Sequence, residues 1–146
     1  MANRSALDTL IELAQRDTDE AAKRLGAALS AVAEAEQKLA MLLDYRQDYA
    51  ERLQAAQQVG MTPMAYRNFV AFVDKLDNAI NGQREVLKHA QHKAAVGKTD
   101  WQACERKRLS YRTLDQRAAE AALKVENKRD QKQTDEHAAR QAHYKR

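Results

Sequence analysis

Two histidines, His89 and His92, stand three positions apart in a stretch of helical composition, so their imidazoles could reach one metal ion. A zinc or copper site in a protein needs further ligands, usually thiolates, imidazoles or carboxylates. No cysteine or acidic residue is placed beside this pair in an obvious ligand position. We therefore predict that both histidines lie on the surface and that the protein binds no metal ion.

The tripeptide Gly97-Lys98-Thr99 has the ending of a phosphate-binding loop. That loop needs another glycine five residues earlier, where this chain has His92, and it needs a preceding β-strand. No Ser, Cys or His is spaced as a nucleophile with its base. Cys104, the one cysteine, cannot form an internal disulfide and falls on an apolar stripe, which favours a small core residue. We predict no catalytic residue, no cofactor and no enzyme activity.

The segment Gln-Gln-Val-Gly-Met-Thr-Pro at residues 57–63 combines the strongest turn signals in the chain. Gly60 suits the position just after a helix, where a left-handed backbone is required. Thr62 can cap a second helix, and Pro63 suits its first position. A turn this short folds two long helices back antiparallel, so residues at the same level should have numbers that sum to about 121.

The first helix is expected to begin at Asn3 or Ser5, since Ser5 and Asp8 have the spacing of a capping box. Apolar residues then recur in alternating steps of three and four, which predicts a coiled-coil seam. Its first row is Leu7, Ala14, Ala21, Ala28, Ala35, Leu42, Tyr49 and Ala56. Its second row is Ile11, Thr18, Leu25, Val32, Leu39, Arg46 and Leu53.

The second helix carries a matching seam, which is interrupted by Gln83 and Gly97 and dissolves beyond Val125. Its members are Phe69, Val73, Leu76, Ile80, Leu87, Ala90, Ala94, Trp101, Cys104 and Tyr111. Because Ala118 lies level with Asn3, the last 25 or so residues have nothing in this chain to pair with. The sequence thus predicts an all-α fold, a long antiparallel two-helix coiled coil, or helical hairpin, with an overhanging C-terminal helix. The expected bounds are a single coiled-coil domain over 1–146, helices over about 4–58 and 63–143, a turn at 59–62 and an optional break near 97–100.

The composition supports a thin helical bundle, because 28 of the 146 residues are alanine and only eight are aromatic. Residues 1–58 carry 7 basic and 10 acidic side chains, whereas residues 63–146 carry 18 basic and 11 acidic. These opposite charges suit two paired helices. The basic residues alternate with acids and alanines, which favours a solvated face over nucleic-acid binding. The chain has no membrane-spanning run and no signal-peptide core, so we expect a cytosolic protein.

Large apolar residues are in excess near the turn, within residues 41–49 and 69–80. A two-helix seam uses only two positions per heptad, so some of these side chains are expected to face outward and to mark a partner site. Three level pairs would form one surface: Leu42 with Ala79, Tyr45 with Leu76, and Tyr49 with Phe72. The alternative is a locally wider core packed by a short third helix.

Two segments carry polar groups in patterns that heptads alone do not require: Leu39-Ala-Met-Leu-Leu-Asp-Tyr-Arg-Gln-Asp-Tyr49 and Glu126-Asn-Lys-Arg-Asp-Gln-Lys-Gln-Thr-Asp-Glu136. At this separation they resemble the family of the flagellar type III export protein FliJ. The resemblance covers the whole chain, including its length and the position of its turn.

The resemblance implies a coiled coil like the central stalk of rotary ATPases. It implies three partners, namely the hexameric ring of the export ATPase FliI, the export-gate protein FlhA and flagellar export chaperones. The gate-contact surface of the family matches the level pairs above, Leu42, Tyr45, Tyr49, Phe72, Leu76 and Ala79, and departs from the family at Lys38 and Gln83. ATPase contacts are expected at the open end of the hairpin and along the overhang, at Leu7, Ile11, Ala14, Leu114, Val125, Asn127, Asp130 and Gln131.

The sequence is therefore interpreted as a nonenzymatic stalk and coupling component of the flagellar type III export apparatus that assists chaperone-delivered export. It would be cytoplasmic and peripheral at the cytoplasmic face of the inner membrane, at the flagellar base. Two alternatives are a generic cytosolic coiled-coil adaptor and a nucleic-acid-binding helical arm like that of some synthetases. The favoured interpretation expects neither a nucleic-acid partner nor an integral membrane segment.

Overall fold

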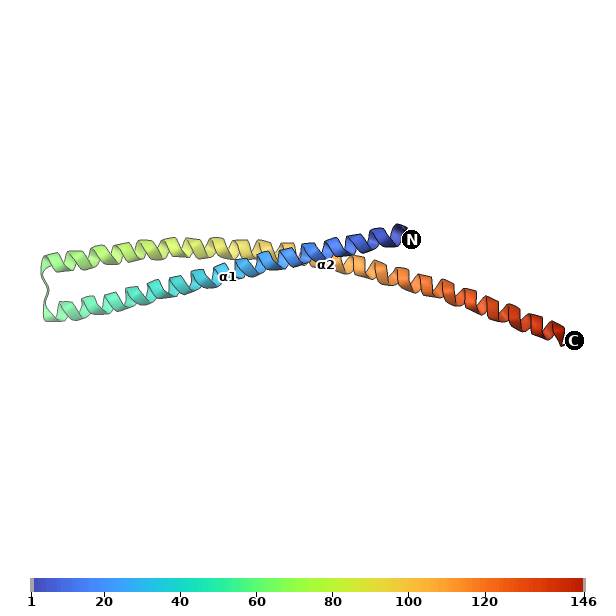
Figure 1. The fold of residues 1–146 in the computed structure, drawn as a ribbon. Coiled ribbons are helices and arrows are strands. Elements are labelled where there is room, and N and C mark those ends of the chain that lie inside the picture. The colour runs from blue at the N-terminus through green and yellow to red at the C-terminus, as the bar shows by residue number, and fades with distance from the viewer. Residues whose placement is uncertain (1, 146) are drawn as a thin grey trace. The chain divides into compact units, whose positions relative to one another are not determined.

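Two long antiparallel helices make up the computed structural model, which describes the backbone of residues 2–145 and the side chains of residues 5–145 (Figure 1). Helix α1 spans Ala2–Val59 and helix α2 spans Pro63–Tyr144. Apart from residues 60–62 and Lys145, every described residue is helical. The predicted all-α, antiparallel two-helix coiled coil is confirmed. Over the described residues, neither helix contains an apolar stretch of the length that a bilayer span requires.

The chain divides into two units, which are described separately. The hairpin unit comprises residues 19–102, with the turn at one end. The end unit comprises residues 1–18 and 103–146. The expectation of a single coiled-coil domain over the whole chain stays a prediction.

The turn has the local structure that its residues predict. Gly60 has a φ of 101°, in the left-handed region, and its N–H donates to the carbonyl of Ala56 at 3.0 Å, which closes α1. The Thr62 hydroxyl oxygen accepts the N–H of Ala65 at 3.1 Å, and the Thr62 carbonyl accepts the N–H of Tyr66 at 3.0 Å. Thr62 is therefore the N-cap of α2, and Pro63 is its first residue, as predicted.

The seam of the hairpin unit buries small residues of α1 and both large and small residues of α2. Ala21, Ala28 and Ala35 are buried, and so are Leu76, Ile80 and Ala94 on α2. A Cβ placed on Gly97 would lie 3.6 Å from the Cα of Leu25, so the backbones approach closely at this level. Gln83, which interrupts the apolar pattern, points its amide at α1 and donates to the Ala35 carbonyl at 3.2 Å.

In the end unit the seam is built in the same way and then stops. Ala14 and Thr18 are buried, and the Thr18 hydroxyl donates to the Ala14 carbonyl at 2.8 Å, so its polar group is satisfied within α1. On α2, Cys104 and Tyr111 are half-buried. Every side chain from residue 116 to residue 145 is exposed, as expected for the overhang.

Helix bounds differ from the sequence prediction at two places. Helix α1 begins at Ala2, so Ser5 is not its cap; the Ser5 carbonyl instead accepts the Thr9 hydroxyl inside the helix at 2.9 Å. Helix α2 is continuous through residues 97–100, where the sequence left a break open. Close packing of Gly97 against Leu25 and the helix-forming residues around it outweigh the helix-breaking tendency of one glycine.

Substitution of the turn glycine should destabilise the protein, whereas the same substitution within α2 should not. We expect Gly60→Ala to lower the free energy of unfolding by about 1–2 kcal/mol, because an L-residue is strained at positive φ. The matched control is Gly82→Ala, at a helical position with open space for a Cβ, and it should stabilise by roughly 0.5–1 kcal/mol. Urea unfolding of both variants measures the difference, and equal effects would show that the turn tolerates another conformation.

Candidate functional site

The six residues expected to contact the export gate differ widely in exposure. Tyr45 is 61% exposed and Ala79 is also exposed, whereas Leu76 is only 8% exposed and belongs to the core. Leu42, Tyr49 and Phe72 are half-buried. Tyr45 and Ala79 therefore have the most surface to offer a partner, and Leu76 can act mainly by supporting them from beneath.

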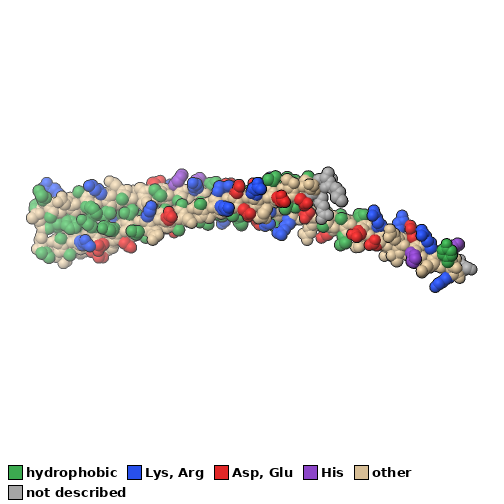
Figure 2. Space-filling view, viewed as in Figure 1, with side chains coloured by type: hydrophobic (Ala, Val, Ile, Leu, Met, Phe, Trp, Pro, Cys, Tyr) green, Lys and Arg blue, Asp and Glu red, His purple; other side chains and the backbone are tan. Residues whose placement is uncertain are grey.

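An aromatic cluster ties α1 to α2 close to the turn. The rings of Tyr49 and Phe72 are stacked, with centroids 4.3 Å apart and planes at 29°, and the ring of Phe69 lies 5.2 Å from that of Tyr49. The excess of apolar residues near the turn is thus partly used inside the hairpin. On the face that Figure 2 shows, hydrophobic side chains gather over this part of the hairpin unit.

The exposed residues beside this cluster lie on one face of the hairpin unit. Residues that directly precede seam positions on both helices line one hollow: Ala31, Glu34, Lys38, Val86, His89 and Lys93. Met41 and Tyr45 continue that row along α1, and Ala79 continues it along α2, at helical spacing. We name Lys38, Met41, Tyr45, Ala79 and Val86 the Tyr45 face; its apolar members are exposed and are bordered by Asp44 and Asp48.

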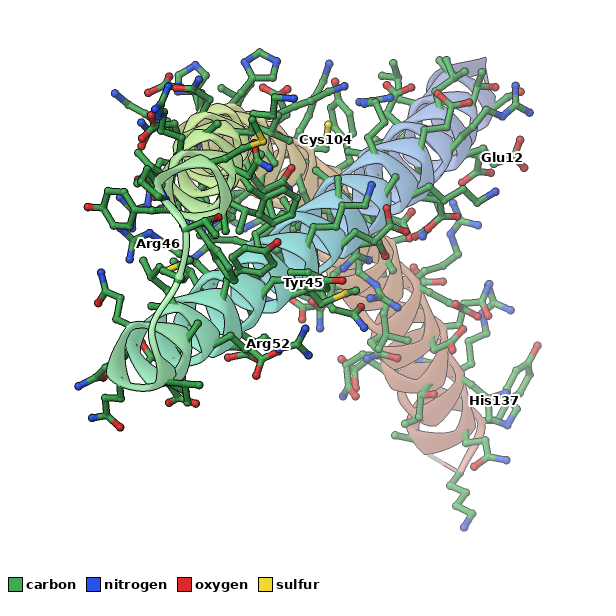
Figure 3. All side chains as sticks on the ribbon, turned by 90° about the vertical axis from the view of Figure 1, so that its left-hand side faces the viewer. Glu12, Tyr45, Arg46, Arg52, Cys104 and His137 are labelled. Carbon is green, nitrogen blue, oxygen red and sulfur yellow. The ribbon has the colours of Figure 1, made fainter. Side chains whose placement is uncertain are left out.

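An ion pair joins the helices on the opposite face. Arg46, one helical turn beyond Leu42, is labelled in Figure 3. Its Nε donates to Oδ1 of Asp77, and its Nη2 lies 3.5 Å from Oδ2. The hydrogen bond from Arg46 holds the pKa of Asp77 below its ordinary value; desolvation opposes this shift, and the positive charge of Arg46 adds a smaller lowering. The rule that residues at the same level have numbers summing to about 121, here called the level rule, could have identified this pair. From the sequence, Arg46 was interpreted only as a polar residue in the seam.

The residues expected to contact the ATPase fall into two groups within the end unit. Ala14 is buried and Leu7 and Ile11 are half-buried, so these three mainly hold the two helices together. The other five are exposed on α2: Leu114, Val125, Asn127, Asp130 and Gln131. Val125 is 63% exposed, and with Asn127 and Gln131 it borders a shallow hollow on the surface of α2.

A second ion pair, which sequence reasoning missed, lies in the end unit. Arg108 donates from Nε and Nη2 to the carboxylate of Glu105, one turn earlier on α2, and both side chains are largely covered. The hydrogen bond from Arg108 lowers the pKa of Glu105, opposed by burial and assisted by the charges of Arg108 and Arg112. Glu–Arg pairs at this spacing are common on exposed helices, so the sequence held no signal that this one is covered.

The candidate metal and nucleotide residues do not assemble into a site. Across residues 5–145, no three His, Cys, Asp or Glu side chains lie close enough to hold a metal ion. Lys98 and Thr99 are within α2, and the Thr99 hydroxyl donates to the Ala95 carbonyl at 3.1 Å. Cys104 is a free, half-buried thiol.

Comparison with known proteins gives one consistent result. A model of the flagellar FliJ protein family matches residues 3–146. The flagellar FliJ proteins of Escherichia coli (strain K12) and Salmonella typhi are each 34% identical to this chain over 142 residues, covering 97% of this chain and 97% of theirs. A solved structure of CT670 from Chlamydia trachomatis, described as a homolog of YscO, is 16% identical with a TM-score of 0.46 and coverage of 97% and 93%.

The lowered pKa of Asp77 predicts sensitivity to acid. A carboxyl group whose pKa is lower in the folded state stabilises the fold above its unfolded pKa, and that contribution disappears as the pH falls through the folded value. We expect the midpoint temperature of thermal unfolding to decrease once the pH is lowered below about 4, where the pKa of an ordinary Asp side chain lies. Asp77→Asn should lower the midpoint at pH 7 and reduce its fall in acid, and Arg46→Gln should do the same. Unchanged acid sensitivity in both variants would show that the pair contributes nothing to stability.

Proposed function

Because the chain belongs to the flagellar FliJ family, nonenzymatic components of the flagellar type III export apparatus, we propose that it is a stalk that couples the export ATPase to the export gate. In this proposal the hairpin unit contacts the gate protein FlhA, and the end unit contacts the hexameric ring of the ATPase FliI. The protein then works at the cytoplasmic face of the inner membrane, at the flagellar base, where it assists export of substrates delivered by chaperones.

The observation that carries the proposal is the exposure of Tyr45 and its neighbours next to a seam that is already filled. Tyrosine combines a large apolar ring with a polar group, and such residues dominate the energy of protein interfaces. Met41 and Val86 are exposed on the same face and extend the apolar area. Asp44 and Asp48 border it, which gives the apolar centre and charged rim typical of an interface between proteins.

The aromatic cluster supports this surface from below. Stacking of Tyr49 on Phe72 fixes the last turns of α1 against the first turns of α2, and burial of Leu76 fixes the next turn. The backbone that carries Tyr45 and Ala79 is therefore held in place before any partner binds. A preformed surface loses less conformational entropy on binding, which favours affinity.

The proposed ATPase contact rests on the loss of the seam in the end unit. Residues 126–146 carry 6 basic and 4 acidic side chains, and all of their described side chains are exposed. Helical segments without an apolar face gain little stability from packing within their own chain, so a partner is needed to hold them. The mixed charge suits polar contacts within a ring better than a hydrophobic socket.

Removal of the Tyr45 ring should weaken binding to the gate protein without destabilising the fold. We expect Tyr45→Ala to weaken binding to the cytoplasmic domain of the gate protein by about 2 kcal/mol, roughly 30-fold, and to change the free energy of unfolding by less than about 0.5 kcal/mol. Leu43→Ala is the matched control, because Leu43 is an exposed apolar residue of the same helix on the opposite face. Calorimetric titration and urea unfolding measure the two effects.

Tyr49→Ala provides the structural comparison, since it should lower the free energy of unfolding by about 1–2 kcal/mol through loss of the stacked ring. Wild-type gate binding by Tyr45→Ala would exclude the Tyr45 face as the contact. A large loss of stability in Tyr45→Ala would show instead that the ring belongs to the core.

Truncation after Val125 tests the other end of the stalk. We expect the shortened protein to keep its helical unfolding transition and its gate affinity, because residues 126–145 pack against nothing in their own unit. Its stimulation of ATP hydrolysis by the export ATPase should fall by at least about threefold, since its proposed contacts are removed. The matched control replaces residues 126–146 by a Glu-Ala-Ala-Ala-Lys helix of equal length, which should not restore stimulation. Full stimulation by the truncated protein would contradict the proposed polarity.

A further inference from the structure

A second face of the hairpin unit lies opposite the Tyr45 face and has a different chemical character. The residues that come directly after seam positions lie on the same side of both helices. Four of them line a single hollow together with the seam residues Arg46 and Ile80: Leu43 on α1, and Asp77, Asn81 and Arg84 on α2. Farther from the turn, the same rows contain Ala22, Gly26, Leu29 and Ala33 on α1, and Lys88, Gln91, Ala95 and Lys98 on α2. We name these eight residues the Leu29 face.

Small side chains make the Leu29 face easy to approach closely. Ala22, Gly26 and Ala33 flank Leu29 along α1, and Leu29 is 54% exposed. A Cβ built on Gly26 would meet nothing within 4 Å, so packing within this chain gives no reason for glycine there. Glycine inside a helix is less favourable than alanine, and its presence is explained if another backbone approaches this position.

The two charged residues of the Leu29 face are both basic. Residues 22–33 and the residues level with them, 88–99, contain no Asp or Glu. They contain five Lys and Arg residues, of which Lys88 and Lys98 are on the Leu29 face. These two lysines are ten positions apart on α2, so their attachment points are separated by about 15 Å along the helix.

The geometry points to an amphipathic α-helix of a partner protein as the occupant of the Leu29 face, and we propose that this helix packs small apolar residues over Gly26 and Leu29 and presents acidic side chains to Lys88 and Lys98. Acidic residues ten or eleven positions apart on one side of a helix would match the separation of the lysines. This surface is distinct from the proposed gate contact and does not depend on it, because the two faces lie on opposite sides of the seam.

Other anionic partners fit the face less well. Single-stranded nucleic acid is usually held by aromatic stacking as well as by basic residues, and residues 21–33 and 88–99 contain no Phe, Tyr or Trp. Two lysines also provide few phosphate contacts, and phosphates would leave Leu29 unburied. An acidic helix satisfies the lysines and covers the leucine together, which is the usual arrangement of a helix bound in a groove.

The test uses the full chain and two fluorescent 21-residue helical peptides. One peptide carries alanine and leucine on one face with glutamates ten positions apart at its edge, and the other has glutamine in place of those glutamates. Fluorescence anisotropy should show at least about tenfold tighter binding of the glutamate peptide, an advantage that shrinks as salt is raised. Equal binding of the two peptides, or no binding of either, would overturn the proposal.

Charge reversal provides the decisive variants. The double variant Lys88→Glu with Lys98→Glu should bind the glutamate peptide at least about tenfold more weakly than the wild type does. A peptide with lysines in place of the glutamates should bind this variant with the lost affinity restored. The matched control is Arg24→Glu with Lys93→Glu, which changes the net charge equally but lies on the Tyr45 side of the seam. If the control weakens binding as much, the attraction is nonspecific and the proposal fails.

Two further measurements exclude trivial explanations. Leu29→Ser should lower the affinity for the peptide. It should not lower the midpoint of thermal unfolding, because the Leu29 side chain is exposed. An unchanged affinity would contradict the proposed apolar contact. Sedimentation equilibrium should show that the protein without peptide remains a monomer at the concentrations used. A dimer abolished by the Lys88→Glu and Lys98→Glu variant would identify a second copy of this chain as the occupant and overturn the proposal.

Discussion

The structure depends on how closely α1 approaches α2, and alanine on α1 allows that approach. In the hairpin unit Ala21, Ala28 and Ala35 are buried, and Gly97 lets the two backbones approach at Leu25. Because such a seam is narrow, it covers only a thin strip of each helix. The remaining surface of both helices stays outside, which explains why a chain of this composition can expose apolar side chains on two faces without a thick core.

Sequence reasoning succeeded where the determining interactions are local or periodic. The turn was predictable because Gly60, Thr62 and Pro63 each satisfy a requirement of a neighbouring helix end. The seam was predictable because its rows repeat over many heptads. The level rule also held, since Tyr49 stacks on Phe72 and Gln83 reaches Ala35, pairs whose numbers sum to about 121.

The predictions that needed correction concern which side of a helix a residue faces. The level rule places Tyr45 beside Leu76 but does not say that one is exposed and the other buried, because it fixes height and not rotation about the helix axis. A separate correction concerns the start of α1 at Ala2, which precedes both expected starts, Asn3 and Ser5; the capping pattern of Ser5 is not used by the helix. The Glu105–Arg108 pair was missed because only packing distinguishes it from an ordinary surface pair.

The antiparallel arrangement also bears on how the hairpin unit folds. Contacts between α1 and α2 join residues that are progressively farther apart in the chain with distance from the turn: Arg46 and Asp77 are separated by 31 positions, and Ala35 and Gln83 by 48. Loop-closure entropy opposes distant contacts more than near ones. We therefore expect pairing to begin at the aromatic cluster of Tyr49, Phe69 and Phe72 and to spread away from the turn. The same residues that hold the helix ends together in the native protein would then serve as its folding nucleus.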